Sequence, residues 1–293
     1  MKEINYSIII PHKNIPSLLQ RCLDSIPQRD DIQIVIVDDN SSSEKVNFDD
    51  FPAKNRKNTE VYFTKEGKGA GYARNVGLKH AIGKWLLFAD ADDFFNEGFL
   101  VHTDKYLDSD NDIIYWSINS VYSETLEPAD RGVYINEYIM KAAQGDINST
   151  DFVRYKFLYP SAKMIRKKLV DDNNIFFDEV PASNDTMFGV KVGSKAQKVA
   201  FDTFQLYCLT LRKNSLVTSY SYRNLKSRLN VSFVLYYYLK NIGKEKYAQS
   251  SIGHLLQIRH ASYHKFVCDF FLVLKKLPFK VVLCQINQVF HRL

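Results

Sequence analysis

The chain has 293 residues, of which 45% are hydrophobic and 25% are charged, and its net charge at pH 7 is +6. This composition is ordinary for a soluble globular protein, and the length suits one large domain or one domain with an extension. No run of about 18 uninterrupted apolar residues occurs, which argues against a transmembrane helix. The chain starts directly with a predicted strand, so we expect no signal peptide. Four widely spaced cysteines, in no metal-ligand pattern, indicate reduced thiols and a cytosolic protein: Cys22, Cys208, Cys268 and Cys284.

The charge is divided unevenly along the chain. The residues from Gln205 onwards contain 14 Lys and Arg but only two acids, Glu245 and Asp269, so this part carries +12. The first 204 residues contain 25 basic and 31 acidic residues and carry −6. A basic tail on an acidic body predicts an anionic partner for the tail.

The first half of the chain alternates short apolar runs with helical patterns. Residues 6–11 (YSIIIP) form a continuous apolar run and predict a buried strand. The next segment predicts a helix that Asn14 caps and that has Pro16 in its first turn. The apolar face of this helix consists of Leu18, Leu19, Cys22, Leu23 and Ile26.

A second buried strand is predicted over residues 32–37 (IQIVIV), and it ends in Asp38 and Asp39. The next predicted elements are a strand over 60–64, a Gly- and Lys-rich loop over 65–71, a helix over 72–81 and a strand over 85–89. Strands that alternate with helices predict βαβ units and a mainly parallel sheet. In such a sheet the polar residues that follow the strands meet at one edge.

After about residue 112 the pattern changes, and no internal repeat is visible. The predicted elements of this part are a strand over 112–122, a helix over 134–143, a strand over 161–165, a short helix over 166–172, a helix over 184–193 and a strand over 198–211. Asn184 is the predicted N-cap of the last of these helices. From Ser221 to the end the sequence looks wholly helical, with Tyr, Lys and Arg throughout.

The most informative stretch is 88–93 (FADADD), where an apolar strand ends abruptly in Asp90, Asp92 and Asp93. In an open α/β sheet, ligands bind outside the carboxyl ends of the strands. Clustered carboxylates at that place predict a site for a hard divalent cation such as Mn²⁺ or Mg²⁺. The alternative is a solvated acidic turn before a helix, with Asp93 or Asn96 as its N-cap.

Four segments in chain order carry a resemblance to a known family: 11–14 (PHKN), 37–42 (VDDNSS), 67–77 (GKGAGYARNVG) and 88–93 (FADADD). Together they resemble the family 2 glycosyltransferases, over roughly residues 6–215. The resemblance implies an α/β protein with the GT-A fold, a Rossmann-like, mainly parallel central sheet flanked by helices. The implied domains are a catalytic domain over 1–215, with a nucleotide-sugar half over 1–112 and an acceptor half over 113–215, and a helical region over 216–293.

The resemblance also implies roles at the nucleotide-sugar site. Asp39 stands where the family reads uracil, whose imide N–H a carboxylate can accept, although a turn-forming role is the alternative. Asp92 is implied as the principal metal ligand, and Asp90 as a contact to ribose or a water-mediated second ligand. Arg74 flanks the nucleotide or pairs with the acidic cluster. The other implied binding residues are Pro11, His12, Asn14, Gly69, Ala91 and Arg212, of which His12 replaces an aromatic residue and can equally be a packing residue.

The implied reaction needs a general base for the acceptor hydroxyl. The family has an acidic pair where this chain has Asn184 and Asp185, so Asp185 is the implied base and Asn184 departs from the pattern. The alternative for Asp185 is an acid in the first turn of a helix, favoured by the macrodipole. Lys163 faces the acceptor or supports the fold. Residues 211–217 (LRKNSLV) resemble a basic loop that covers the pyrophosphate, with a solvated turn as the alternative.

The implied function is the inverting, metal-dependent transfer of a sugar from a nucleotide-sugar, in particular a UDP-sugar, to an acceptor hydroxyl. The implied acceptor is a saccharide or a lipid-linked saccharide in the synthesis of a cell-surface polysaccharide (capsule, O-antigen or exopolysaccharide). Two alternatives stay open. One is a catalytically silent carbohydrate- or membrane-binding scaffold with the same fold. The other is a sugar nucleotidyltransferase, although no activating Gly-rich signature occurs near the N-terminus.

The basic tail has its own prediction. Residues 270–280 (FFLVLKKLPFK) are too interrupted by charge to span a membrane. Basic amphipathic helices with aromatic residues suit an anionic membrane surface, so residues 221–293 predict peripheral attachment at the inner face of the cytoplasmic membrane. The alternatives are packing on the catalytic domain and a homodimer. No nucleic-acid-binding module is visible, so we expect no nucleic-acid partner.

Overall fold

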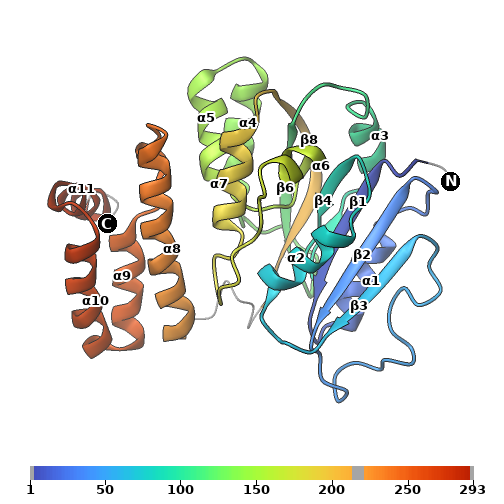
Figure 1. Ribbon diagram of the computed structural model, residues 1–293, viewed down its shortest axis with the longest axis horizontal. Helices are drawn as coiled ribbons and strands as arrows, with labels where there is room; N and C mark the ends of the chain where they lie inside the picture. The colour runs from blue at the N-terminus through green and yellow to red at the C-terminus, as the bar shows by residue number, and fades with distance from the viewer. Residues whose placement is uncertain (1–2, 213–220, 291–293) are drawn as a thin grey trace.

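Eight strands form one sheet in the computed structural model, which describes residues 3–212 and 221–290 (Figure 1). The strands are β1 Tyr6–His12, β2 Ile32–Asp39, β3 Thr59–Thr64, β4 Trp85–Phe88, β5 Phe94–Phe95, β6 Ile113–Tyr122, β7 Lys163–Arg166 and β8 Val199–Leu211. Their order across the sheet is β3-β2-β1-β4-β7-β6-β8-β5. The α/β class predicted from the sequence is therefore confirmed.

The half of the sheet built from the first 90 residues is entirely parallel. β1 pairs in parallel with β2 and β4, and β2 pairs in parallel with β3. Every residue of β1, β2 and β4 is buried, as expected of apolar runs in a sheet that is covered on both faces. The carboxyl ends of these strands therefore lie at one edge, where residues 11–14, 38–41 and 89–93 follow them.

The other half of the sheet mixes directions. β6 pairs with β8 in parallel, whereas β4 with β7, β6 with β7 and β5 with β8 are antiparallel. Parallel pairs thus form the majority, as predicted. The connection over residues 40–58 between β2 and β3 contains no helix, so the alternation of strands and helices is not complete.

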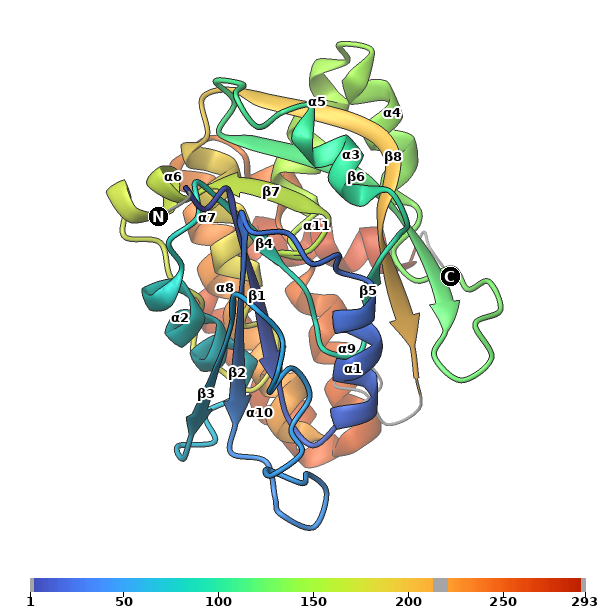
Figure 2. The same ribbon diagram turned by 90° about the vertical axis from the view of Figure 1, so that its right-hand side faces the viewer.

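Helices α1 Pro16–Asp24 and α2 Ala70–His80 cover opposite faces of β1–β3 (Figure 2). The prediction that Asn14 caps α1 is wrong, because Ile15 occupies the cap position and no side chain caps the helix. Asn14 has a φ of 59° and binds the loop after β2 instead. Its N–H donates to Ser41 Oγ at 2.7 Å, and its Oδ1 accepts from the Ser42 N–H at 2.8 Å.

The part of the chain after β5 contributes α3 Phe99–Asp104, α4 Ile135–Ala143, α5 Ile147–Lys156, α6 Lys167–Asp172 and α7 Thr186–Lys195. The sequence reading missed α5, although Asp146 caps it by accepting the Ser149 N–H. Asn184 is not the cap of α7, since Asp185 occupies that position. Neither Asp93 nor Asn96 caps α3, whose cap is Gly98.

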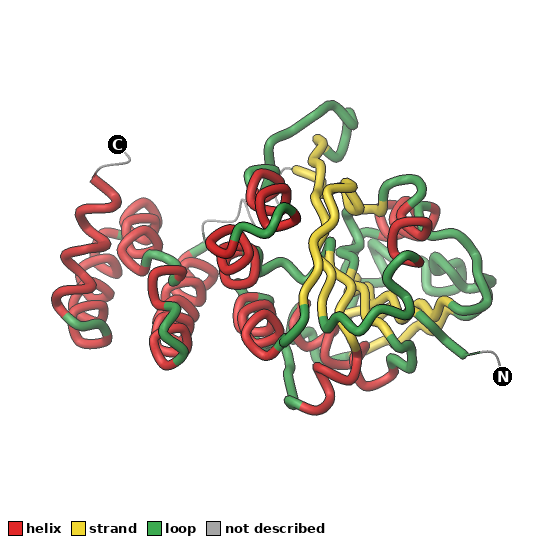
Figure 3. Tube along the Cα trace, turned by 90° about the horizontal axis from the view of Figure 1, so that it is seen from above, coloured by secondary structure: helices red, strands yellow, loops and turns green. Residues whose placement is uncertain are grey.

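The C-terminal region is helical, as predicted: α8 Tyr222–Asn241, the 3₁₀ helix η1 Glu245–Tyr247, α9 Ser251–Ala261, α10 Tyr263–Lys276 and α11 Phe279–Phe290 (Figures 1 and 3). One face of α8, with Val231, Leu235 and Leu239, packs against Tyr155 and Val190 of α5 and α7. Its other face packs with α9–α11 in a separate core. Packing on the preceding part of the chain, one of the alternatives predicted for the tail, is therefore observed for α8. The domain boundary expected near residue 215 lies outside the described residues and stays a prediction.

None of the helices formed by residues 3–212 and 221–290 is both long and apolar enough to cross a bilayer.

Candidate active site

Asp39 lies at the carboxyl end of β2 and is only 3% exposed. Its Oδ2 accepts the Gly69 N–H at 2.9 Å and lies 3.3 Å from Lys13 Nζ. Its Oδ1 is buried and has no hydrogen-bond partner among the described residues. A buried carboxylate oxygen without a donor is costly, so this atom fits an N–H group supplied by a ligand.

The neighbouring Asp38 holds the strand ends together instead. Its Oδ2 accepts from Ser41 Oγ at 2.6 Å and lies 2.7 Å from His12 Nδ1, and its Oδ1 accepts the Ser41 N–H at 2.9 Å. Burial alone would raise the pKa of Asp38, but the hydrogen bonds from His12 and Ser41 outweigh it and lower that pKa. His12 Nε2 accepts the Ile15 N–H at 3.2 Å. Both ring nitrogens of His12 are thus used within the protein, which supports the packing alternative for this residue.

The glycine-rich loop brings the N-terminus of α2 against the segment that precedes α7. Gly69 is the N-cap of α2 with a φ of 94°, a conformation that favours glycine. At Gly71 an added Cβ would lie 2.1 Å from the Asp178 carbonyl oxygen and 3.0 Å from Asn184 Cβ. Helix α2 and residues 178–184 can therefore approach this closely only because residue 71 lacks a side chain.

Replacing Gly71 by alanine should destabilise the fold by about 3 kcal/mol, because the methyl group collides with backbone rather than with a flexible side chain. Thermal or urea unfolding measures the change. Gly253→Ala in α9 is the matched control, since its Cβ would meet nothing closer than 3.6 Å and should add about 0.5 kcal/mol of stability. Equal stabilities of the two variants would contradict the close approach.

The turn after β4 is held by groups from distant elements. The Asp90 N–H donates to Tyr207 Oη at 2.8 Å. The Asp92 carbonyl oxygen accepts from Arg21 Nη2 at 2.6 Å and from Thr210 Oγ1 at 2.8 Å. The side chains of Asp90 and Asp92 stay 34% and 20% exposed. These contacts fix the backbone of the turn and leave its two carboxylates partly exposed, one beside Arg74 and the other beside Arg212.

Asp93 is different, because it is fully buried. Its Oδ1 accepts the Thr210 N–H at 2.7 Å, and its Oδ2 has no partner among the described residues. Burial, together with the nearby charges of Asp92 and Asp90, raises the pKa of Asp93 well above its ordinary range. Asp93 supports the turn through its hydrogen bond to Thr210, and the helix-cap role predicted for it is wrong.

Arg74 connects the acidic turn to the segment before α7. It is 5% exposed; its Nη2 binds Asp90 Oδ1 at 2.5 Å and its Nη1 donates to Asn184 Oδ1 at 2.9 Å. Pairing with the acidic cluster, the alternative weighed for Arg74, is thus what the structure shows. It also explains Asn184, since a neutral amide there accepts one guanidinium hydrogen bond without adding another negative charge.

Asp185 is the residue before α7, and no hydrogen bond from its side chain caps that helix. Burial raises the pKa of Asp185, the charge of Arg74 opposes this rise, and the charge of Asp90 adds to it. Arg74, which pairs with Asp90, also hydrogen-bonds Asn184, the residue directly before Asp185. A carboxylate with a raised pKa next to a ligand site is suited to accept a proton.

Lys163 supports the fold. It is 1% exposed, and its Nζ donates to the Phe157 carbonyl at 2.6 Å and to the Tyr159 carbonyl. The ammonium group also lies 4.2 Å from the centroid of the Phe157 ring. Burial lowers the pKa of Lys163 to about 7. Of the two roles weighed for this residue, the structural one is supported.

Arg212 follows β8, and its Nε lies 2.8 Å from Asp92 Oδ2. The guanidinium group therefore lies at the acidic turn. Residues 213–217 of the predicted basic loop lie outside the described residues. Pro11 and Ala91 are buried at the strand ends, so they can shape only the backbone of the site.

The fit of a divalent cation depends on Asp92 and Asp90. No group of three or more His, Cys, Asp or Glu side chains placed to hold a metal occurs within residues 3–212 and 221–290. Mg²⁺ and similar ions are commonly bound by one or two carboxylates plus waters and substrate phosphates. Two partly exposed carboxylates on a rigid turn fit that kind of shared site.

The sequence reading missed Arg21 and Thr210, which hold the acidic turn from α1 and β8. Nothing in the local pattern of either residue signals this role, because the contact exists only after the chain folds. The pairing of Lys13 with Asp39 was not predicted either, although Lys13 belongs to the motif at residues 11–14.

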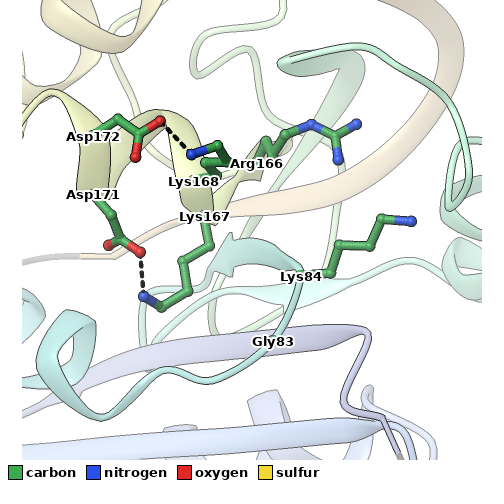
Figure 4. A pocket seen from close by; sticks show the side chains of 7 residues that line it. All are labelled: Gly83, Lys84, Arg166, Lys167, Lys168, Asp171 and Asp172. Atoms are coloured by element: carbon green, nitrogen blue, oxygen red, sulfur yellow. Dashed lines mark hydrogen bonds and ion pairs between the residues drawn. The ribbon is translucent and has the colours of Figure 1, made fainter.

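A surface pocket elsewhere is no rival site. It lies beside Gly83 and Lys84, at the amino end of β4, and is also lined by residues 166–168, 171 and 172 (Figure 4). Lys167 pairs with Asp171, and Lys168 pairs with Asp172. These charges are already neutralised, and the pocket lies at the opposite end of β4 from the acidic turn.

Comparisons with known families and curated proteins agree with this geometry. A family model described as glycosyl transferase family 2 matches residues 7–173, more than half of the chain. The poly(ribitol-phosphate) beta-N-acetylglucosaminyltransferase TarS of Staphylococcus aureus is 22% identical over 269 residues, which cover 89% of this chain and 45% of TarS. The poly(ribitol-phosphate) beta-glucosyltransferase of Bacillus spizizenii is 24% identical, over 74% of this chain and 34% of that protein. The chain thus spans less than half the length of these two relatives.

Solved structures show the same fold. Residues 1–349 of S. aureus TarS in complex with UDP-GlcNAc superpose with a TM-score of 0.66 at 22% identity, over 88% of this chain and 71% of that one. The mannosyltransferase PcManGT of Pyrobaculum calidifontis, in complex with GDP-Man and Mn²⁺, gives a TM-score of 0.56 at 14% identity, over 99% and 80% of the two chains.

Proposed function

Since this chain belongs to glycosyl transferase family 2, we propose that it transfers a sugar from a UDP-sugar to an acceptor hydroxyl with inversion at the anomeric carbon. One observation carries the proposal. Asp39, the turn with Asp90 and Asp92, and the segment with Asp185 meet at one edge of the sheet, and Arg74 joins the last two. This is the edge at which parallel α/β sheets bind ligands.

Asp39 reads the base in this proposal. Uracil presents one N–H between two carbonyl groups, and the unpartnered Oδ1 of Asp39 is the acceptor for it. The second oxygen stays bound to Gly69, which fixes the orientation of the carboxylate. The N-terminus of α2 begins beside this contact and favours the negative charge of the diphosphate.

The diphosphate leaves from the acidic turn. A divalent cation would be held by Asp92, with Asp90 bound to ribose or joining through water, and when bound it would neutralise the charge that develops on the leaving diphosphate. Arg212, already beside Asp92, adds positive charge at the same place. The turn itself does not need to move, because Arg21, Thr210 and Tyr207 hold its backbone.

Asp185 takes the acceptor proton. The acceptor oxygen forms the new bond to the anomeric carbon as the bond to the diphosphate oxygen breaks, and the hydroxyl proton moves to Asp185. The products are the glycosylated acceptor and UDP, and atoms and charges balance when Asp185 later returns the proton to water. The sheet holds Asp185 on the segment after β7, whereas the diphosphate side is built from β1, β2 and β4.

The test is turnover of a panel of UDP-, GDP- and dTDP-sugars with Mn²⁺ or Mg²⁺, read as release of the nucleoside diphosphate. We expect UDP-sugars to be preferred. If none of the three classes turns over or raises the melting temperature, the chain is a silent scaffold and the proposal fails. Release of pyrophosphate from UTP and a sugar phosphate would instead identify a nucleotidyltransferase.

Asp39→Asn should weaken UDP binding about ten- to a hundredfold, because the amide turns an N–H donor toward the uracil N–H. Its oxygen can still accept the Gly69 N–H, so the loop stays in place. Cytosine has an acceptor at the same ring position, so the variant should bind CDP more tightly than the unmodified chain does. Calorimetric titration of UDP and CDP checks both signs, and a parallel loss of both affinities would contradict the base contact.

The acceptor is a saccharide or a lipid-linked saccharide of a cell-surface polysaccharide, and the site of action is the cytoplasmic side of the membrane. Family membership and relatives named for transfer to poly(ribitol-phosphate) support this proposal.

A further inference from the structure

The outer face of α10 carries an apolar stripe that no other part of residues 3–212 and 221–290 covers. Tyr263, Val267, Phe271 and Leu274 recur every three or four residues and are 69%, 37%, 64% and 36% exposed. The inner face of α10 is filled separately, since Val273 is fully buried in the core shared with α8 and α9. The stripe is therefore surplus to what the helical core needs.

Helix α11 adds two further exposed apolar side chains. Phe279 and Leu283, one helical turn apart, are 68% and 46% exposed. In Figures 1 and 3, α10 and α11 lie at the end of the molecule farthest from β1–β3. We call the exposed residues of the two helices, Tyr263, Val267, Phe271, Leu274, Phe279 and Leu283, the outer face.

The exposed charged side chains of α9–α11 are all positive. The chain has one acidic residue beyond Glu245, namely Asp269. Asp269 is 3% exposed and is bound by Lys226 and by Tyr222 Oη. The exposed charged residues of α9–α11 and their connections are therefore all cations: Arg259, Lys265, Lys275, Lys276 and Lys280.

This combination selects one kind of partner. A symmetric contact with the same face of a second copy would bring these cations against their own equivalents, because no exposed carboxylate in the described part of α9–α11 can pair with them. A bilayer with anionic phospholipids complements the outer face in two ways. Its negative surface can pair with the cations, and the apolar layer beneath that surface can receive the apolar side chains. Exposed aromatic side chains flanked by Lys are typical of helices that lie in this interface.

We propose that the outer face of α10 and α11 binds the surface of a membrane rich in anionic phospholipids. The aromatic and aliphatic side chains enter the boundary between headgroups and acyl chains, and the lysines contact phosphate groups. Helix α8 lies between α9–α11 and helices α5 and α7, so the outer face is separate from the residues proposed for the transfer. The proposal narrows the expected membrane contact from residues 221–293 to one face of two helices, and it stands apart from the proposed transferase activity.

Flotation of the full chain with vesicles of phosphatidylcholine and phosphatidylglycerol in equal parts tests the proposal. The chain should float with these vesicles and not with phosphatidylcholine alone. NaCl at about 1 M, where the screening length is about 3 Å, should release it. The double variants Phe271→Ser with Phe279→Ser, and Lys276→Glu with Lys280→Glu, should each lower the partition coefficient about tenfold or more.

The controls match exposure and charge elsewhere on the chain. Val101→Ser with Ile147→Ser removes two apolar residues that are 66% and 77% exposed, and Lys57→Glu with Lys79→Glu reverses two exposed lysines. Both should float like the unmodified chain, and all four variants should keep the turnover of UDP-sugar in free solution.

Three results would overturn the proposal: failure of the unmodified chain to float, equal binding to phosphatidylcholine alone, or equal losses of binding in the control variants. So would a dimer in light scattering that the two Phe substitutions dissociate without any vesicle binding.

Discussion

Replacing Asp185 by asparagine should lower the turnover of the UDP-sugar about a thousandfold, because asparagine keeps the shape of the side chain but accepts no proton. The affinity for UDP should stay within about twofold, since the nucleotide contacts lie on β2 and the acidic turn. Steady-state release of UDP with an acceptor present, together with UDP titration, separates the two effects. Asp178→Asn is the matched control: this acid lies on the same segment and burial raises its pKa too, yet it has no place in the transfer.

The turnover rate should also depend on pH, because Asp185 must be ionised to accept the acceptor proton. Burial raises the pKa of Asp185 above the usual range near 4, and only the ionised form can act as a base. Activity should therefore fall with decreasing pH at a point above the range of an ordinary aspartate. A flat acid limb in the unmodified chain, or unchanged activity in Asp185→Asn, would remove Asp185 from the role of base.

Stability provides a second check on Asp185. A carboxyl group whose pKa is raised by folding favours the folded state when it is protonated, and this contribution is lost as the pH rises through the raised pKa. Asparagine mimics the protonated form at all pH values. The variant should therefore unfold at the same temperature as the unmodified chain or higher at pH 7, which distinguishes a catalytic defect from misfolding.

Replacing Asp92 by asparagine should lower turnover by a similar factor, about a thousandfold, because a neutral amide is a weaker ligand for a hard cation than a carboxylate. A readout besides activity is thermal shift with UDP, with and without MnCl₂. The unmodified chain should gain stability from the metal in the presence of UDP, and the variant should lose that gain.

The control for Asp92 is Asp108→Asn, whose side chain is 92% exposed and pairs only with Lys84. It should retain both turnover and the metal-dependent gain in melting temperature. If Asp92→Asn keeps its response to MnCl₂, the cation is held elsewhere and the assignment of Asp92 is wrong. If Asp92→Asn loses turnover but keeps that response, Asp92 acts through Arg212 rather than through a metal.

The sequence alone determined every strand except the short β5 and also the acids at the strand ends. Apolar runs such as 6–11 and 32–37 can be satisfied only inside a covered sheet, and the carboxylates after them must then reach its carboxyl edge. Local patterning was therefore enough to identify the α/β class, most helices and the position of the acidic turn. Local patterning predicted the wrong helix caps at Asn14 and Asn184, because both residues form hydrogen bonds with distant segments instead.

Only the tertiary structure decided which of two adjacent residues faces a ligand. Asp38 and Asp39 look alike in sequence, but the register of β1 and β2 places His12 opposite Asp38. The carboxylate of Asp38 therefore bonds within the protein, whereas Oδ1 of Asp39 has no hydrogen-bond partner among the described residues. Likewise, the sequence shows that the tail is basic and aromatic, but not that α8 faces the catalytic region while one face of α10 stays uncovered. The physical reason is the same in both cases. Residue type and spacing determine what a side chain can bond, whereas only packing between distant segments determines which of those bonds are already made.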